Sequence, residues 1–263
     1  MDPTEDDNPI VRSLLADYPF REAPIRQLHH YLALRDGNRL LAFGPRATGK
    51  TAVVGALVSR LPRLFAATIN ALSHISAKNV YEAVLRQLRR RLVALCEQEE
   101  EEEEEETANM TEFLDRAKAL NITGCTSSPV FLDRLQKLLE CFADFVFHLQ
   151  QVKGEKHLEE FQKKLVLVVD NADAFFQEER WAELVYLLGN IEVLTEKVVP
   201  VSVVFISIHS VDWIVRHCDA KWDLLEVVFN SYSIAELNQL LSKRAVPRTV
   251  GANLKYSPEF YAR

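Results

Sequence analysis

Cysteine is scarce in this sequence of 263 residues, which has only Cys96, Cys125, Cys141 and Cys218. The four include no CxxC pair and no Cys/His cluster, so the spacing of a zinc site and that of a secreted disulfide framework are both missing. No apolar run approaches the roughly 18 residues of a membrane-spanning helix. The first seven residues are acidic and lack the apolar segment of a signal peptide. These absences predict a soluble intracellular protein with no membrane partner.

An excess of positive charge is also absent, because the net charge is −7. Glu97 and the run Glu99–Glu106 together supply nine carboxylates, more than the whole negative balance. The remainder of the chain lacks the strongly basic footprint of a self-sufficient DNA-binding protein, although it is compatible with a subunit of one. Consecutive glutamates repel one another, so we expect residues 97–128 to be an acidic, disordered insertion. Recognition of a basic partner by this run is the alternative.

Apolar patterning outside the acidic run predicts strands that alternate with helices, after a flexible leader at residues 1–18. Short buried strands are expected at Arg39–Phe43, Leu64–Ile69, Leu165–Asp170, Val201–Ser207 and Leu225–Phe229. Helical spacing is found at Ala23–Leu34, Lys50–Leu61, Lys78–Cys96, Val130–Val152, Glu178–Leu194 and Ser233–Lys243. The last helix begins with a capping box, Ser233 and Glu236. Such alternation is typical of βαβ crossovers, so the fold class is α/β with a mostly parallel five-stranded sheet flanked by helices.

One sequence motif indicates a binding site. The segment Gly44-Pro45-Arg46-Ala47-Thr48-Gly49-Lys50-Thr51 matches GxxxxGK[ST] and lies between a predicted strand and a predicted helix. Its glycines let the backbone curl so that N–H groups face phosphate oxygens, and the helix adds its positive dipole end. Lys50 is expected to contact the β- and γ-phosphates and Thr51 to bind Mg²⁺. The motif therefore predicts a nucleotide-phosphate site.

A second acidic centre is needed for the metal, and the strand Leu165–Asp170 supplies one at its carboxyl end. The alternative is that Asp170 only caps the helix that follows. Hydrolytic relatives usually have Glu next, to polarise the attacking water, whereas this sequence has Asn171, which cannot take a proton. Asp173 is a partial substitute only if the turn is unusual, and we expect it to point elsewhere. Ser207, at the end of another strand, either senses the γ-phosphate or simply ends the strand.

In this order, these features resemble an AAA+ module over about 230 residues. The segment Tyr18-Pro-Phe-Arg-Glu22 and the amphipathic helix after it resemble the start of the initiator-type ATPases of origin recognition complexes and Cdc6. Further resemblances are Asp170-Asn-Ala-Asp173, Phe229-Asn-Ser-Tyr-Ser233 and Tyr256-Ser-Pro-Glu-Phe-Tyr261. The resemblance implies a nucleotide-binding domain at 19–232 and the beginning of a helical lid at 233–263.

The same resemblance implies ATP and Mg²⁺ as cofactors, bound by residues 44–51 and Asp170, with Thr51 and Asp170 as metal ligands. It also implies a hetero-oligomeric ring of origin-complex subunits in the nucleus, which contacts origin DNA through the assembly. In such rings an arginine reaches the next subunit's γ-phosphate, and Arg216 is the candidate; the alternative is an ordinary surface arginine. Two functions stay open: an assembly subunit in which ATP joins neighbours, or an active P-loop ATPase or signalling switch.

Overall fold

Five parallel strands form one sheet in the computed structural model, which describes residues 8–34, 36–61, 64–102, 107–153, 163–218 and 223–245. The strands are β1 (Arg39–Phe43), β2 (Phe65–Asn70), β3 (Leu165–Asp170), β4 (Val201–Ser207) and β5 (Leu225–Val228). Their order across the sheet is β2-β3-β4-β1-β5, with every pair parallel. This arrangement confirms the predicted α/β fold. Parallel pairing brings the carboxyl ends of the strands to one edge, where Phe43 is level with Ser207 and Asn70 with Asp170.

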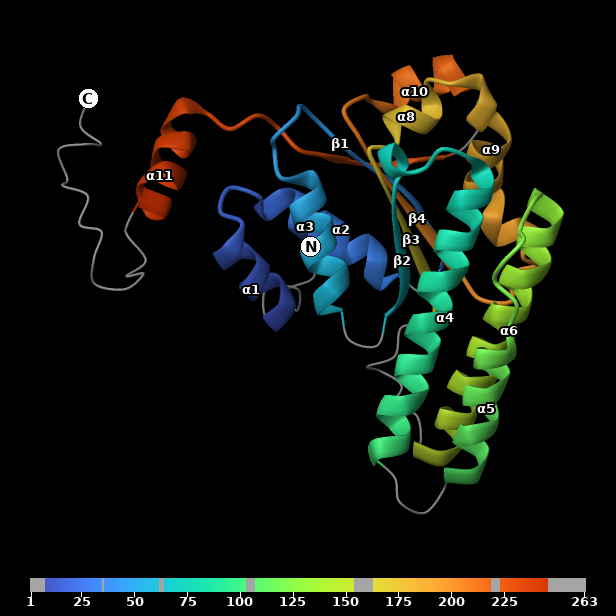
Figure 1. The fold of residues 1–263 in the computed structure, drawn as a ribbon. Coiled ribbons are helices and arrows are strands. Elements are labelled where there is room, and N and C mark those ends of the chain that lie inside the picture. The colour runs from blue at the N-terminus through green and yellow to red at the C-terminus, as the bar shows by residue number, and fades with distance from the viewer. Residues whose placement is uncertain are drawn as a thin grey trace, which may run out of the picture. The chain divides into compact units, whose positions relative to one another are not determined.

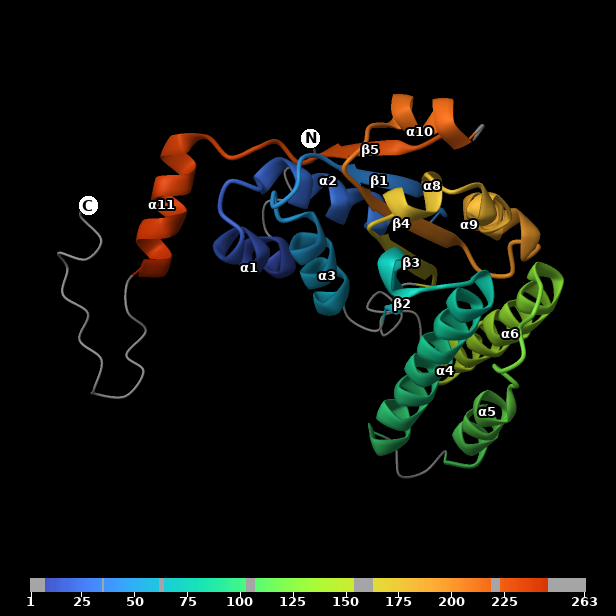
Figure 2. The ribbon, with the colours of Figure 1, turned by 45° about the horizontal axis from the view of Figure 1, so that its top comes forward.

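Helices cover both faces of this sheet (Figures 1 and 2). The helices before residue 231 are α1 (Pro9–Asp17), α2 (Glu22–Ala33), α3 (Lys50–Arg60), α4 (Ala77–Glu102), α5 (Thr107–Ala119), α6 (Ser128–Lys153), α8 (Asp173–Phe176), α9 (Ala182–Leu194) and α10 (Val211–Cys218), with short 3₁₀ helices η2 (Ala71–Ser73) and η3 (Glu179–Trp181). A further helix, α11 (Ile234–Ala245), follows the last strand in the sequence. Successive strand residues alternate between two cores, Leu41 in one and Leu40 in the other. Buried residues of α1, α2 and α3 belong to the second core, and those of α4, α5, α6 and α9 belong to the first.

The chain before the first strand differs from its prediction. We expected a flexible leader at residues 1–18, but residues 9–17 form α1, with Asn8 capping its first turn through bonds from the Ile10 and Val11 backbone. Val11 and Leu14 are buried in the core that also contains α3. Burial of these two side chains holds the helix in place, so the leader prediction is wrong for residues 9–17, and residues 1–7 lie outside the described part.

The prediction of an acidic, disordered insertion at residues 97–128 also needs correction. Helix α4 continues to Glu102 and α5 begins at Thr107, while residues 103–106 lie outside the described part. Beyond them, Ala117, Ile122 and Cys125 are buried in the first core. Glutamate has good helix propensity, and extending an existing packed helix needs no new nucleus, so α4 runs into the acidic residues. The buried side chains of α5 then pack against α4 and α6.

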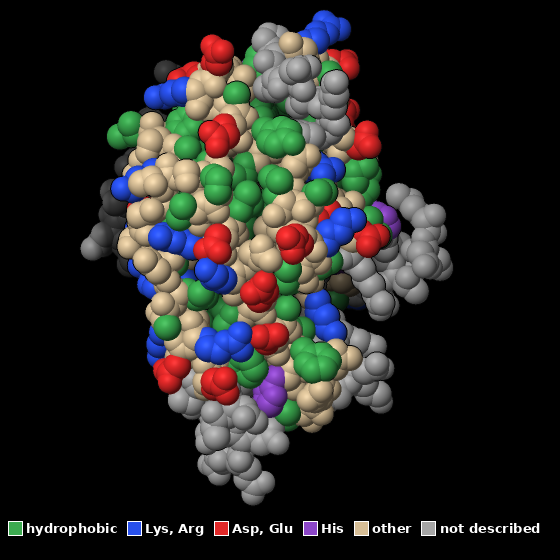
Figure 3. Space-filling model, turned by 90° about the vertical axis from the view of Figure 1, so that its right-hand side faces the viewer, with side chains coloured by type: hydrophobic (Ala, Val, Ile, Leu, Met, Phe, Trp, Pro, Cys, Tyr) green, Lys and Arg blue, Asp and Glu red, His purple; other side chains and the backbone are tan. Residues whose placement is uncertain are grey.

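The surface charge is mixed on the side seen in Figure 3, where acidic and basic side chains are interspersed over one face. Neither sign gathers into a continuous patch there. This agrees with the absence of a strongly basic footprint in the sequence. None of the described helices has the length and apolar character needed to cross a membrane.

The chain divides into two units, and the second begins at Ser231. Its described part is α11, which starts with the predicted capping box: Ser233 N donates to Glu236 at 2.7 Å, and Glu236 N donates to the Ser233 hydroxyl at 3.2 Å. The expected division was after residue 232. The rest of the predicted lid, including Tyr256–Tyr261, lies outside the described residues.

Candidate functional site

The loop that joins β1 to α3 has two backbone positions that suit glycine alone. Gly44 has a φ of 148°, and a Cβ on it would lie 2.1 Å from the Phe229 carbonyl oxygen. Gly49, with a φ of 90°, is the residue from which α3 starts. A side chain at either position would be strained, and at Gly44 it would collide with β5's end. The glycines of the motif are therefore explained by local geometry as well as by phosphate binding.

Lys50 folds back over this loop. Its Nζ donates to the carbonyl oxygens of Gly44 and Pro45, both at 2.7 Å, and the side chain is buried. Burial lowers the pKa of Lys50, while the charges of Asp173 and Asp170 act in the opposite direction. An ammonium group surrounded by carbonyl oxygens and carboxylates is suited to a phosphate that approaches from the loop.

The backbone N–H groups of this loop are hydrogen-bond donors beside the Lys50 ammonium group. Arg46 and Ala47 lie in a hydrogen-bonded turn of this loop, and the Gly49 N–H that follows donates to no residue that the structure describes. Consecutive N–H groups in a curled loop, followed by a helix N-terminus, form an anion-binding concavity. A concavity of this kind at residues 44–51 would accept a phosphate group.

Asp170 lies beside the start of α3. The Thr51 hydroxyl donates to Asp170 Oδ1 at 2.9 Å, which joins the P-loop to the end of β3. Two hard oxygen atoms in contact, next to a phosphate cradle, fit Mg²⁺, which takes few protein ligands and completes its octahedron with phosphate and water. No cluster of three or more metal-binding side chains occurs in the described residues, so these two would hold the metal only together with a nucleotide. Bound there, the ion would neutralise phosphate charge.

Asn171 follows in the left-handed region, with a φ of 53°. Its backbone N–H donates to Asp170 Oδ1 at 3.0 Å, and its side-chain amide donates to Asn70 Oδ1 at 3.1 Å. Asn70, at the end of β2, was missed by sequence reasoning. Its place directly after the strand predicted at Leu64–Ile69 is the signal that could have found it.

Asp173 requires a correction, because it faces the site instead of pointing elsewhere. The unusual backbone of Asn171 turns the chain so that Asp173 accepts hydrogen bonds from the Ser207 hydroxyl and from Ile208 N at 3.1 Å. Both Asp173 and Ser207 line a pocket of about 310 Å³ together with Lys50, Thr51 and Asp170. Ser207 is thus in the site, oriented by Asp173. Arg216 is exposed on α10 and does not line this pocket.

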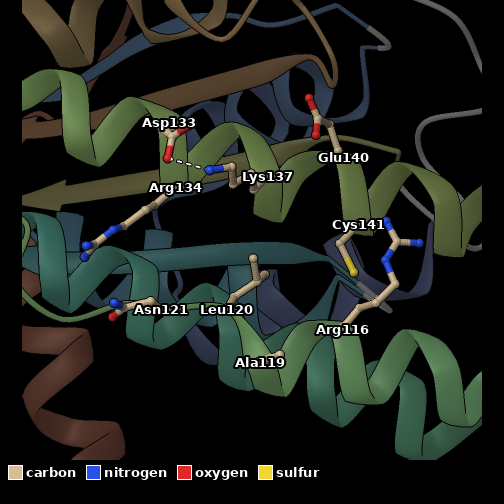
Figure 4. A pocket seen from close by; sticks show the side chains of 9 residues that line it. All are labelled: Arg116, Ala119, Leu120, Asn121, Asp133, Arg134, Lys137, Glu140 and Cys141. Atoms are coloured by element: carbon tan, nitrogen blue, oxygen red, sulfur yellow. Dashed lines mark hydrogen bonds and ion pairs between the residues drawn. The ribbon is translucent and has the colours of Figure 1, made fainter.

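A larger hollow, of about 580 Å³, lies between α5 and α6, away from the P-loop (Figure 4). Its basic side chains are already engaged: Lys137 with Asp133 at 2.8 Å, Arg116 with Asp144 at 2.9 Å, and Arg134 with the Thr123 carbonyl. The bond to Asp144 is the main cause that raises the pKa of Arg116. Without a glycine-rich loop or an unpaired cluster of donors, this hollow lacks the chemistry of the P-loop pocket.

Comparison with known sequences decides the family, because a sequence model of the AAA ATPase domain matches residues 18–204. The chain belongs to the AAA ATPase domain family. AAA ATPase domains bind nucleotide, which agrees with the P-loop geometry of this one. No curated protein matches the sequence.

Several solved structures resemble the fold of this chain. A chain of the Drosophila ORC bound to DNA is 18% identical with a TM-score of 0.58, covering 89% of this chain and 52% of that one. The Aeropyrum pernix ORC1 protein in complex with DNA is 21% identical with a TM-score of 0.51, covering 89% and 53%. A Walker-type ATPase of Pyrococcus abyssi is 12% identical with a TM-score of 0.50, covering 85% and 57%. This AAA chain therefore spans little more than half the length of those proteins.

Proposed function

We propose that this chain is an ATP-binding subunit of an origin recognition complex, corresponding to the fifth subunit of the eukaryotic assembly. In this role ATP and Mg²⁺ join the chain to neighbouring subunits, which together bind origin DNA in the nucleus and load the replicative helicase. The observation that carries the proposal is a phosphate and metal site, Lys50, Thr51 and Asp170, beside an amide, Asn171. Such a site binds nucleotide well and lacks the usual group that activates water.

Three further observations support the proposal. The Asp170-Asn-Ala-Asp173 segment departs from the usual Asp-Glu pair as the fifth subunit does, and the segments at Phe229 and Tyr256 resemble that subunit. The segment at Tyr18 resembles the initiator group more generally. The two solved structures described above as ORC or ORC1 were determined with DNA. Arg216 is exposed on α10, which suits a residue that reaches a neighbour's nucleotide.

The test is reconstitution of this chain with the other origin-complex subunits, with ATP or without nucleotide. The proposal expects ATP-dependent incorporation, and Lys50→Ala should weaken ATP binding about ten- to a hundredfold, since charge-assisted contacts contribute roughly 1.5–3 kcal/mol. Lys78→Ala is the matched control, because Lys78 is exposed on α4 and outside the pocket. If the chain is incorporated equally well without ATP and with Lys50→Ala, ATP does not join it to its neighbours. If the chain is not incorporated at all, it is not a subunit of this complex.

An active ATPase or signalling switch is the second candidate, and the position of Asp173 favours it. Its carboxylate lies in the pocket and its charge acts on Lys50. The Asp173 oxygens, however, already accept bonds from the Ser207 hydroxyl and Ile208 N, which occupy lone pairs that an attacking water would need. Rapid phosphate release by the isolated chain, lost in Asp173→Asn, would favour this candidate over the assembly subunit.

A further inference from the structure

We infer that Arg21 is a positioning residue for the phosphate-binding loop, which it controls through the peptide between Thr48 and Gly49. This inference rests on the nucleotide binding proposed above. The Nε–H of Arg21 donates to the Thr48 carbonyl oxygen at 2.8 Å, and only 4% of the Arg21 surface is exposed. Arg21 lies outside the P-loop motif, yet its buried guanidinium is hydrogen-bonded to the backbone of that loop.

The N-terminal helices place this arginine. Arg21 is the residue from which α2 starts, directly after Phe20, whose φ of 66° makes a sharp turn between α1 and α2. Its Nη1 also donates to the Phe20 carbonyl at 3.3 Å. Because burying a cation is costly unless it is hydrogen-bonded, the fold keeps the guanidinium against these carbonyl groups. The docking of α1 and α2 on α3, through apolar residues such as Leu14 and Ile25, fixes the position.

Because of the geometry of the peptide bond, the contact between Arg21 and the Thr48 carbonyl also sets the direction of a hydrogen-bond donor, the Gly49 N–H. The peptide between Thr48 and Gly49 is trans, as all described peptides are, so its C=O and N–H point in opposite directions. With the carbonyl directed at Arg21, the Gly49 N–H faces the other side, and it donates to no described residue. Glycine rotates easily, so this peptide can flip and present its carbonyl to a phosphate in place of its N–H. Arg21 prevents that flip.

The consequence is a preorganised loop. When only a fraction of molecules holds the competent peptide orientation, the apparent affinity for nucleotide falls by that fraction. The loss of a charged hydrogen bond shifts such an equilibrium about ten- to a hundredfold. Because the backbone cradle contacts the α- and β-phosphates, ATP and ADP should lose affinity equally. Removing Lys50, which contacts the β- and γ-phosphates, should affect ATP more than ADP.

The experiment compares Arg21→Met and Arg21→Lys by calorimetry with Mg-ATP and Mg-ADP, using Arg60→Met as the matched control. Lysine keeps the positive charge but puts a methylene where Nε was, so it separates charge from hydrogen bonding. Arg60 lies on α3 and pairs with Asp17 of α1, and so tests the docking of the helices without touching the loop. Urea unfolding of each variant establishes that the folded state dominates under the binding conditions.

The inference expects both Arg21 variants to bind ATP and ADP more weakly, by equal factors of up to about ten- to a hundredfold, while Arg60→Met binds as the wild type does. Wild-type affinity in Arg21→Lys would overturn it, and this variant keeps a cation in the site if Arg21→Met does not fold. An equal loss in Arg60→Met would also overturn it, since the docking of the helices would then explain the effect. A wild-type chain that binds neither nucleotide would instead contradict the proposed function.

Discussion

The side-chain amide of Asn171 donates a hydrogen bond to Oδ1 of Asn70 at 3.1 Å, across the ends of the neighbouring strands β3 and β2. Both groups are neutral amides, so neither takes a proton from water. Of the two, Asn171 lines the P-loop pocket, at the position after Asp170 where a water-activating carboxylate would be expected. The geometry therefore suits a site that retains nucleotide, and this relationship leads to the first prediction.

The isolated chain should hydrolyse ATP slowly. Loss of a positioned acid or base costs about 10²–10⁴-fold in rate, which reduces a common turnover near 10 s⁻¹ to on the order of 0.1–0.001 s⁻¹. A phosphate-release assay on the purified chain measures this directly. Turnover near 10 s⁻¹, abolished by Lys50→Ala, would favour the active ATPase instead.

Asn171→Glu is the reciprocal test. A carboxylate at this position could accept a proton from water, so a modest gain in hydrolysis is expected. Asn171→Gln, which lengthens the side chain without adding a base, is the matched control and should give no gain. Equal rates in the two variants would show that a carboxylate at position 171 does not reach the attacking water.

Arg216 should act on a neighbouring subunit and not on its own nucleotide. Arg216→Ala should leave the ATP affinity of the isolated chain unchanged, because the side chain is exposed on α10 and outside the pocket. It should weaken ATP-dependent association with a neighbouring subunit, measured by sedimentation of the reconstituted assembly. A loss of ATP affinity in the isolated variant would mean that Arg216 serves its own site.

The helical arm of α4, α5 and α6 should contribute stability right up to the acidic run. Leu95 is fully buried near the end of α4, so Leu95→Ala should cost about 2–5 kcal/mol of unfolding free energy in urea. Gln98→Ala, three residues on and exposed, should change stability by no more than about 0.5 kcal/mol. If the two variants are equally stable, the end of α4 does not pack as the structure has it.

Stability should also depend on the ionisation of Lys164. Burial lowers its pKa to about 8, against the charges of Asp36 and Glu192, and its Nζ donates to the Leu34 carbonyl at 2.8 Å. The unfolded chain keeps a pKa near 10.5 and so binds more protons than the folded chain between pH 8 and 10.5. Stability contributed by this residue therefore rises with pH across that window.

The measurement compares wild type with Lys164→Met by urea unfolding at pH 7 and pH 10. The wild type should gain on the order of 1–3 kcal/mol relative to the variant as the pH is raised, less where solvent screens the charge. The comparison cancels the other groups that titrate in this range. A difference that does not change with pH would mean that Lys164 keeps its ordinary pKa in the folded state.

Much of the fold could be predicted from short segments of the sequence. Strands such as Arg39–Phe43 and Leu165–Asp170 were correct to the residue, because continuous apolar runs of that length are buried strands almost regardless of context. The P-loop was equally clear, since its spacing and its strand and helix neighbours all lie within one short segment. The insertion predicted at residues 97–128 was misjudged in its described parts, because composition describes repulsion between glutamates and omits the packed helix α4, which continues to Glu102.

The sequence by itself determined the phosphate site, because Gly44, Gly49, Lys50 and Thr51 act through backbone geometry and charge within eight consecutive positions. Only the tertiary structure decided what surrounds it. Parallel pairing of β2, β3 and β4 brings Asn70 to Asn171 and Ser207 to Asp173, and the docking of α1 and α2 brings Arg21 to Thr48. These contacts join residues 27 to 101 positions apart. Their partners are chosen by which faces can bury apolar surface together, a property of the whole chain and not of any one segment.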